Sequence, residues 1–145
     1  MKLFDYMKDD RKRILGRLEE TSQNYDVWPR DRVFESAKKA LESLRLHFYK
    51  ETLLVNNLKE AQSIRSCVGN AAKQRSCIND DVESIVMIHV DEPESSFEEL
   101  LNSIFDKLKA YDTYCEKIYY PALLKHLSEE DMGHAREQMD QLVLS

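Results

Sequence analysis

Apolar residues recur along most of the chain at alternating intervals of three and four, which is the spacing of a helix that buries one face. The longest series of positions at these intervals runs from Val33 to Leu58 and predicts a single long helix. Shorter series in residues 3–18, 78–86 and 97–119 predict three further helices. The segment that begins at Ser128 predicts a short amphipathic helix near the end of the chain.

Residues that favour helix ends separate these series. Pro29 is expected close to the first turn of the second helix. The apolar spacing is lost around Gly69, so we place the turn between the second and third helices there. Pro93 is expected to end the third helix, and the run ESSFEELL that follows supplies a serine as an N-cap for the fourth.

The composition supports an all-helical chain. Only 3 glycines and 3 prolines occur in 145 residues, of which 42% are hydrophobic and 33% charged. Few turn-forming residues mean few and long elements. A chain of this length can bury a core without disulfides or a structural metal. We therefore predict an all-α fold with one domain over residues 1–145, an up-down-up-down four-helix bundle with a short C-terminal fifth helix.

Charged residues occupy positions on the faces that are predicted to be buried. His47 and Glu51 take two consecutive positions of the longest series and, four residues apart, lie on the same helix face. Arg11 completes the series of the first helix. Asp112 and Glu116 repeat the same spacing near the stripe of the fourth helix. Because buried charges are costly unless they are paired or bind a metal, these residues predict a polar layer inside the fold.

Three stretches resemble the hemerythrin-like HHE cation-binding family. LRLHFYKETLL and YDTYCEKIYYPALLKHLSEEDM resemble the family's two half-motifs, in which His-x-x-x-Glu precedes an apolar, aromatic-Pro-x-Leu run. YMKDDRKRI resembles the family's opening stretch, in which a histidine follows an acidic pair. The resemblance covers most of the chain, and the Tyr-Pro-Ala-Leu run after Glu116 is its most specific part. It implies a helical bundle that holds iron between its helices and binds or senses oxygen or nitric oxide.

The resemblance carries the family's metal ligands over only in part. His47 and Glu51 match the first motif, and Glu116 matches the glutamate of the second. Asp112 stands where the second motif has histidine, and Arg11 stands where the family's first helix offers one. A guanidinium stays protonated and cannot bind a metal. The resemblance therefore implies a remnant metal site made of His47, Glu51, Asp112 and Glu116.

His89 is a doubtful further ligand, although it shares the apolar face of the predicted third helix. It lies about four residues before the turn to the fourth helix, whereas Asp112 lies about sixteen residues after it. At a rise of about 1.5 Å per residue, the two residues differ in height by roughly 18 Å. We therefore expect His89 near one end of the bundle.

Two interpretations of the polar layer remain open. In the first, the Arg11 guanidinium replaces the charge of a metal, and the layer binds no metal or binds it weakly. The partners of Arg11 would then be one or more of Glu51, Asp112 and Glu116, in bidentate pairs. In the second, a mononuclear or dinuclear iron site recruits Asp112, His89 or a tyrosine such as Tyr111 as a ligand.

The first interpretation predicts a non-catalytic binding, sensing or regulatory module. No Ser-His-Asp set, Gly-rich phosphate loop or Cys-His nucleophile pattern is visible in the sequence, so we predict no enzyme and no catalytic residue. The alternative is an iron protein that binds or senses oxygen or nitric oxide.

Charge, hydropathy and cysteine content indicate which classes of partner and which compartment to expect. The net charge of -6 disfavours binding to nucleic acid. No run approaches the roughly 20 apolar residues that cross a bilayer, and MKLFDYMKDD has acidic residues where a signal peptide has its apolar core. Cys67, Cys77 and Cys115 have no metal-binding spacing, and a bridge between the first two is the alternative to free thiols. We predict a cytoplasmic protein with no nucleic acid and no membrane partner, and its tail helix is compatible with a homodimer or a protein partner.

Overall fold

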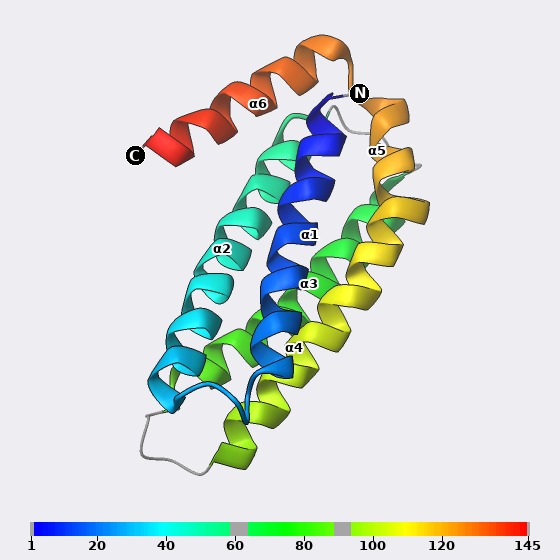
Figure 1. The fold of residues 1–145 in the computed structure, drawn as a ribbon. Helices are drawn as coiled ribbons and strands as arrows, with labels where there is room; N and C mark the ends of the chain where they lie inside the picture. Colours follow the sequence, from blue (N-terminus) through cyan, green and yellow to red (C-terminus); the bar gives the residue numbers. More distant parts are fainter. Residues whose placement is uncertain (1, 59–63, 89–93, 145) are drawn as a thin grey trace.

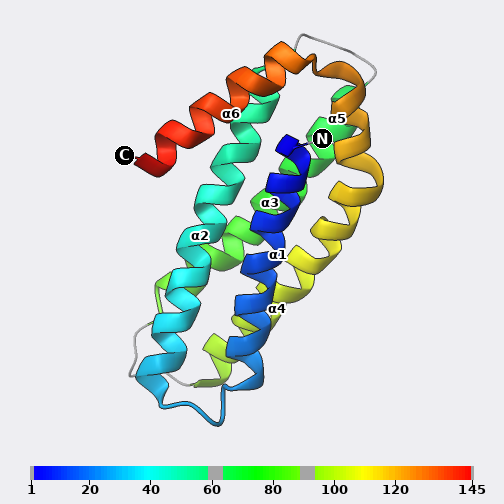
Figure 2. The same ribbon diagram turned by 45° about the horizontal axis from the view of Figure 1, so that its top comes forward.

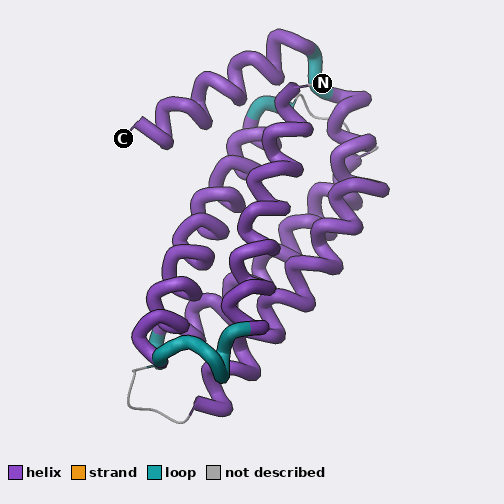
Figure 3. Tube along the Cα trace, in the orientation of Figure 1, coloured by secondary structure: helices purple, strands orange, loops and turns teal. Residues whose placement is uncertain are grey.

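The computed structural model describes residues 2–58, 64–88 and 94–144, and within these ranges the chain is helical with no strand (Figure 3). The all-α prediction is therefore confirmed. None of the described helices combines the length and the apolar character that crossing a bilayer requires. The elements are α1 Lys2–Gln23, α2 Arg30–Asn56, α3 Arg65–Val86, α4 Glu94–Tyr114, η2 Cys115–Tyr119, α5 Tyr120–His126 and α6 Glu129–Leu144.

The long helices lie side by side (Figures 1 and 2). α1 packs along both α2 and α4, and α3 packs along α4. α2 and α3 meet more loosely than these pairs. α6 turns back across the end of α2, where the Asn57 side chain donates a hydrogen bond to Gln138 at 2.9 Å. The polar residues described below lie where α1, α2, α3 and α4 come together.

The buried face of α2 follows the predicted spacing. Val33, Ala37, Ala40 and Leu44 are each no more than 2% exposed. Full burial of a leucine side chain contributes about 1.5–3 kcal/mol relative to leaving it in water. These positions therefore fix which face of α2 points inward, and the same face carries His47 and the residues after it.

Two of the predicted helix boundaries are wrong. α2 ends at Asn56 and α3 already begins at Arg65, so Gly69 lies inside a helix and not in a turn. A glycine in a helix costs only about 1 kcal/mol relative to alanine, and the packing of α3 against α4 outweighs it. α4 begins at Glu94, before either serine of ESSFEELL, so neither of these serines is its N-cap. Val86, predicted to face inward, is the last residue of α3 and is 51% exposed.

The helix widens for one turn between α4 and α5. The N–H of Tyr120 donates to the carbonyl of Cys115, five residues earlier, which is the π-helical pattern. Pro121 has no N–H and cannot make the bond to Lys117 that a regular α-helix would require. The neighbouring residues Tyr119 and Tyr120, at the end of this turn, are both buried, at 0% and 6% exposure.

The start of α6 agrees with the prediction. The Asp131 N–H donates to the Ser128 hydroxyl at 3.0 Å, and the Ser128 N–H donates to the Asp131 carboxylate at 3.1 Å. This reciprocal pair is a capping box, and it satisfies backbone groups that the first helical turn leaves without partners.

Candidate functional site

Arg11 is completely buried, at 0% exposure, on the inner face of α1. Its Nε donates to Oδ1 of Asp112 at 2.6 Å, and its Nη1 donates to the hydroxyl of Tyr120 at 2.7 Å. Its Nη2 is buried, and no residue in the described part of the chain accepts a hydrogen bond from it. The guanidinium therefore makes one hydrogen bond to a carboxylate, not the bidentate pair expected from the sequence. Burial disfavours the charged guanidinium, but the neighbouring acidic groups outweigh burial and raise the pKa of Arg11.

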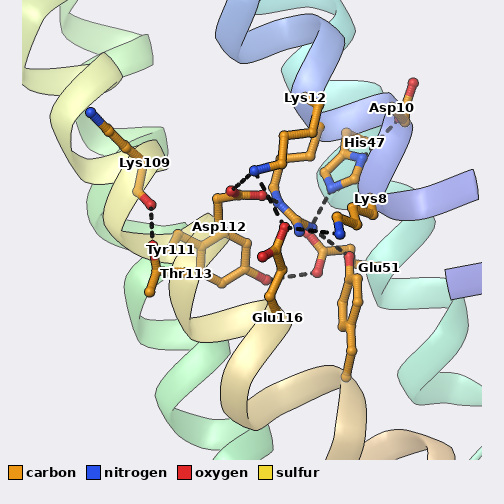
Figure 4. A network of polar contacts seen from close by, with 12 residues as sticks. Lys8, Asp10, Lys12, His47, Glu51, Lys109, Tyr111, Asp112, Thr113 and Glu116 are labelled. Carbon is orange, nitrogen blue, oxygen red and sulfur yellow. Dashed lines mark hydrogen bonds and ion pairs between the residues drawn. The ribbon is translucent and has the colours of Figure 1, made fainter. Parts of the chain in front are cut away.

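Asp112, on α4, connects this buried cation to the surface. Its second oxygen, Oδ2, accepts a hydrogen bond from Lys12 at 2.7 Å (Figure 4). Burial would raise the pKa of Asp112, but the hydrogen bonds and charges of Lys12 and Arg11 hold it below the usual value. Glu116 lies one helical turn further on, with its side chain 33% exposed, and its carboxylate pairs with Lys12 at 3.3 Å and Lys8 at 3.6 Å. Glu116 therefore belongs to the outer edge of the network.

His47 is held between two carboxylates. Its Nδ1 lies 2.8 Å from Oδ2 of Asp10, and its Nε2 lies 3.1 Å from Oε1 of Glu51, the latter a charge contact without hydrogen-bond angles. Carboxylates only accept hydrogen bonds, and a neutral imidazole has one nitrogen without a proton. Only the doubly protonated ring offers a proton to both partners. Burial lowers the pKa of His47, but Asp10 and Glu51 outweigh it, so the pKa is raised.

Glu51 is fully buried, at 0% exposure, and links α2 to α3 and α4. The Tyr111 hydroxyl donates to Oε2 of Glu51 at 2.7 Å and accepts from Nη1 of Arg75 at 2.9 Å (Figure 4 shows Tyr111 and Glu51). Burial raises the pKa of Glu51, but His47, Arg75 and Tyr111 together bring it below the usual value. Burial and the charge of Glu51 raise the pKa of Tyr111, so this hydroxyl stays protonated and donates.

The structure brings His47, Glu51, Asp112 and Arg11 into one layer, as residues of facing helices. The layer also contains groups that the sequence reasoning missed. Three of them are Asp10, Arg75 and Tyr120. The sequence does indicate an inward position for Arg75. The intervals of three and four between the buried residues of α3 continue from Ile78 through Arg75 to Ala71. Because a turn was predicted around Gly69, these positions were not assigned to the third helix.

The side chains present do not fit an iron centre of the family's kind. Both oxygens of Asp112 accept hydrogen bonds from cations, one from Arg11 and one from Lys12. Glu116 faces the lysines at the surface. Across residues 2–58, 64–88 and 94–144, no group of three or more His, Cys, Asp or Glu side chains is placed to hold a metal ion. The contacts in this layer are therefore hydrogen bonds and ion pairs between side chains.

The other residues considered in the sequence analysis are His89 and the three cysteines. His89 lies outside the residues that the structure describes. Cys67 and Cys77 are free thiols on α3, separated by about 15 Å along a helix that rises about 1.5 Å per residue. A disulfide needs Cα atoms within about 7 Å, so the alternative of a bridge between them is wrong. Cys115 is also free and is buried at 0% exposure.

Comparison with the families of known proteins, with individual curated proteins and with solved structures finds no match to this chain.

Proposed function

We propose that this chain is a hemerythrin-like protein, an up-down-up-down four-helix bundle in which fixed ion pairs take the place of the family's metal centre. It acts as a non-catalytic binding or regulatory module in the cytoplasm. The family assignment rests on the motifs around His47 and Glu116, and the bundle topology on the order and packing of α1 to α4.

The observation that carries this proposal is the position of Arg11. A permanently charged guanidinium, fully buried, bonds Asp112, the residue that stands where the family's second motif has histidine. A cation in this place repels a metal ion and neutralises the carboxylate that would bind it. The charge that the family obtains from iron is in this chain supplied by the polypeptide.

The burial of a thiol and two hydroxyl groups in the layer supports a non-catalytic role. The Cys115 thiol and the hydroxyls of Tyr111 and Tyr120 are buried, and burial is the largest cause that raises the pKa of each. A nucleophile needs a lowered pKa or an adjacent base and access to substrate. In the described part of the chain the two hydroxyls instead join helices to one another, and the thiol lies in the hydrophobic core.

Iron content tests the proposal. The protein is purified from iron-supplemented cells and assayed by elemental analysis and near-ultraviolet absorption, and we expect almost no iron. A dinuclear site would give about two irons per chain. A second measurement compares the melting temperature before and after dialysis against a chelator, and we expect no change because no metal supports the fold. Stoichiometric iron, or a melting temperature that falls on chelation, would contradict the proposal.

The second candidate is an iron-binding hemerythrin-like protein for oxygen or nitric oxide. One observation favours it: His47 Nε2 and Glu51 Oε1 are buried and face each other without a hydrogen bond. A single imidazole and a single carboxylate oxygen are fewer donors than iron uses. This candidate would therefore require Arg11 and Asp112 to separate when metal enters, and the iron measurement above decides between the two.

A further inference from the structure

A stripe of exposed residues runs along the outer face of α2. Its positions alternate by four and three, as the buried series does, but on the opposite side of the helix. The stripe consists of Asp31, Glu35, Lys38, Glu42, Arg45 and Tyr49. Across the described chain, none of the stripe's four charged residues from Glu35 to Arg45 forms an ion pair, although neighbours of opposite sign lie close along the helix. Tyr49 is 54% exposed, and the adjacent Leu46 is 37% exposed.

An open apolar pocket lies beside this stripe, where α2 and α3 meet loosely. It has a volume of about 470 Å³ and lies between α2, the end of α3 and the start of α4. The rings of Phe34 and Phe97, 4.3 Å apart, form part of its wall, with Leu41 and Val86. A pocket with apolar walls is suited to an aromatic or aliphatic side chain from a partner.

The charges of the stripe are self-complementary about Ala40. If a second copy of α2 lies antiparallel over the first with Ala40 at the centre, Glu35 meets Arg45 of the second copy. Lys38 then meets Glu42 of the second copy. Each of these contacts occurs twice, because a two-fold interface applies the same patch to both copies. A parallel arrangement in the same register would instead place like charges together.

The same antiparallel arrangement brings Tyr49 to the apolar pocket. The two-fold axis places Tyr49 of the second copy at the level of Asp31 and Phe34, which line the pocket. Tyr49 also lines a hollow between α2 and α3, so it lies on the α3 side of α2, as the pocket does. A two-fold axis that lies between the two α2 helices and is perpendicular to both leaves the two α3 helices on the same side of the α2 pair. Tyr49 of each copy can therefore reach the apolar pocket of the other copy.

We propose that this face of α2 and α3 binds a second copy of the chain, as an antiparallel two-fold dimer in which Tyr49 of each copy enters the apolar pocket of the other. The inference rests on the proposed binding role and names its partner. It does not depend on the metal-free layer, because the stripe lies on the face of α2 opposite His47. The iron content tests the proposed function and the oligomeric state tests the dimer, so either proposal can be contradicted without the other.

Sedimentation equilibrium of the full chain over a wide concentration range tests the dimer. We expect a monomer-dimer equilibrium that weakens as salt rises, because exposed ion pairs are screened. Tyr49→Ser should raise the dissociation constant at least about tenfold, since it removes an anchor twice. Leu124→Ser is the matched control, a change at a 45% exposed residue of α5, and should leave the constant unchanged. A chain that stays monomeric at every concentration, or equal effects of the two variants, would overturn the proposal.

Charge reversal identifies the register. Glu35→Lys and Arg45→Glu each turn two attractive contacts into repulsive ones, so each variant alone should dimerise at least about tenfold more weakly. A mixture of the two single variants should form heterodimers of near wild-type affinity, since the introduced lysine then meets the introduced glutamate and the other contact keeps its native pair. Glu137→Lys, an exposed change on α6, should have no effect. If the mixture is no tighter than either variant alone, the antiparallel register is wrong and the proposal fails.

Discussion

Replacement of Arg11 by leucine tests whether the buried cation holds the polar layer together. The change removes the hydrogen bonds to Asp112 and Tyr120 and leaves a carboxylate whose side chain is only 7% exposed. Loss of one partner from a buried ion pair costs about 3–5 kcal/mol. Asp112 keeps its bond to Lys12, which lies at the protein surface, so we place the loss near the lower end. We expect Arg11→Leu to lower the free energy of unfolding by about 3 kcal/mol at neutral pH.

Urea denaturation followed by circular dichroism measures this loss, and a double-mutant cycle assigns it to the pair. Asp112→Asn alone leaves the guanidinium without its carboxylate and should also destabilise. The combined variant contains neither charge, so it should be about 2 kcal/mol more stable than the sum of the single changes predicts. Arg17→Leu is the control, an exposed arginine of α1, and should change stability by less than about 0.5 kcal/mol.

The pH dependence of the deficit gives an independent check. The lowered pKa of Asp112 contributes stability above the usual carboxyl value of about 3.9, and this contribution is lost as pH falls through the lowered pKa. Arg11→Leu removes much of that contribution, so the wild type and the variant should converge in acid. A deficit below about 1 kcal/mol at neutral pH, or strictly additive effects in the cycle, would refute the reasoning.

Three further predictions concern other parts of the network and the fold. Stability should be highest near pH 5–6: the raised pKa of His47 gives stability that is lost as pH rises through it, and the lowered pKa of Glu51 gives stability that is lost in acid. Unfolding measured across pH checks this, and a flat profile would contradict it. Tyr111→Phe should cost about 2 kcal/mol in urea denaturation because it removes a donor to a buried carboxylate, whereas Tyr114→Phe, at a 3.3 Å contact, should cost less. Ser128→Ala should cost about 1 kcal/mol through loss of the α6 cap, and unchanged thermal unfolding would count against the cap.

The helices could be predicted from the sequence because burial of one face imposes a spacing that is visible without coordinates. Val33, Ala37 and Leu44 show this directly, since the structure buries each of them. The boundary around Gly69 could not be predicted in this way. A glycine stops a helix only when packing does not favour its continuation, and the packing of α3 on α4 is set by residues distant in sequence.

The inward position of Arg11 could also be predicted, because it completes the interval pattern of α1. Its partners could not, since they depend on which helices become neighbours and at what height. Asp112 was among the expected partners, whereas Tyr120 was not. Tyr120 follows the π-helical turn at Cys115–Tyr119, and the interval pattern of α4 does not predict where such a turn occurs.

The wide turn at Cys115–Tyr119 makes the exact length of this segment a requirement of the site. A surface loop absorbs the gain or loss of a residue, because its backbone can adjust without moving the elements it joins. Here a single deletion between Asp112 and Tyr120 would rotate the hydroxyl by about 100° relative to the guanidinium. Any protein that shares this arrangement must therefore tolerate substitutions in the segment far better than insertions or deletions.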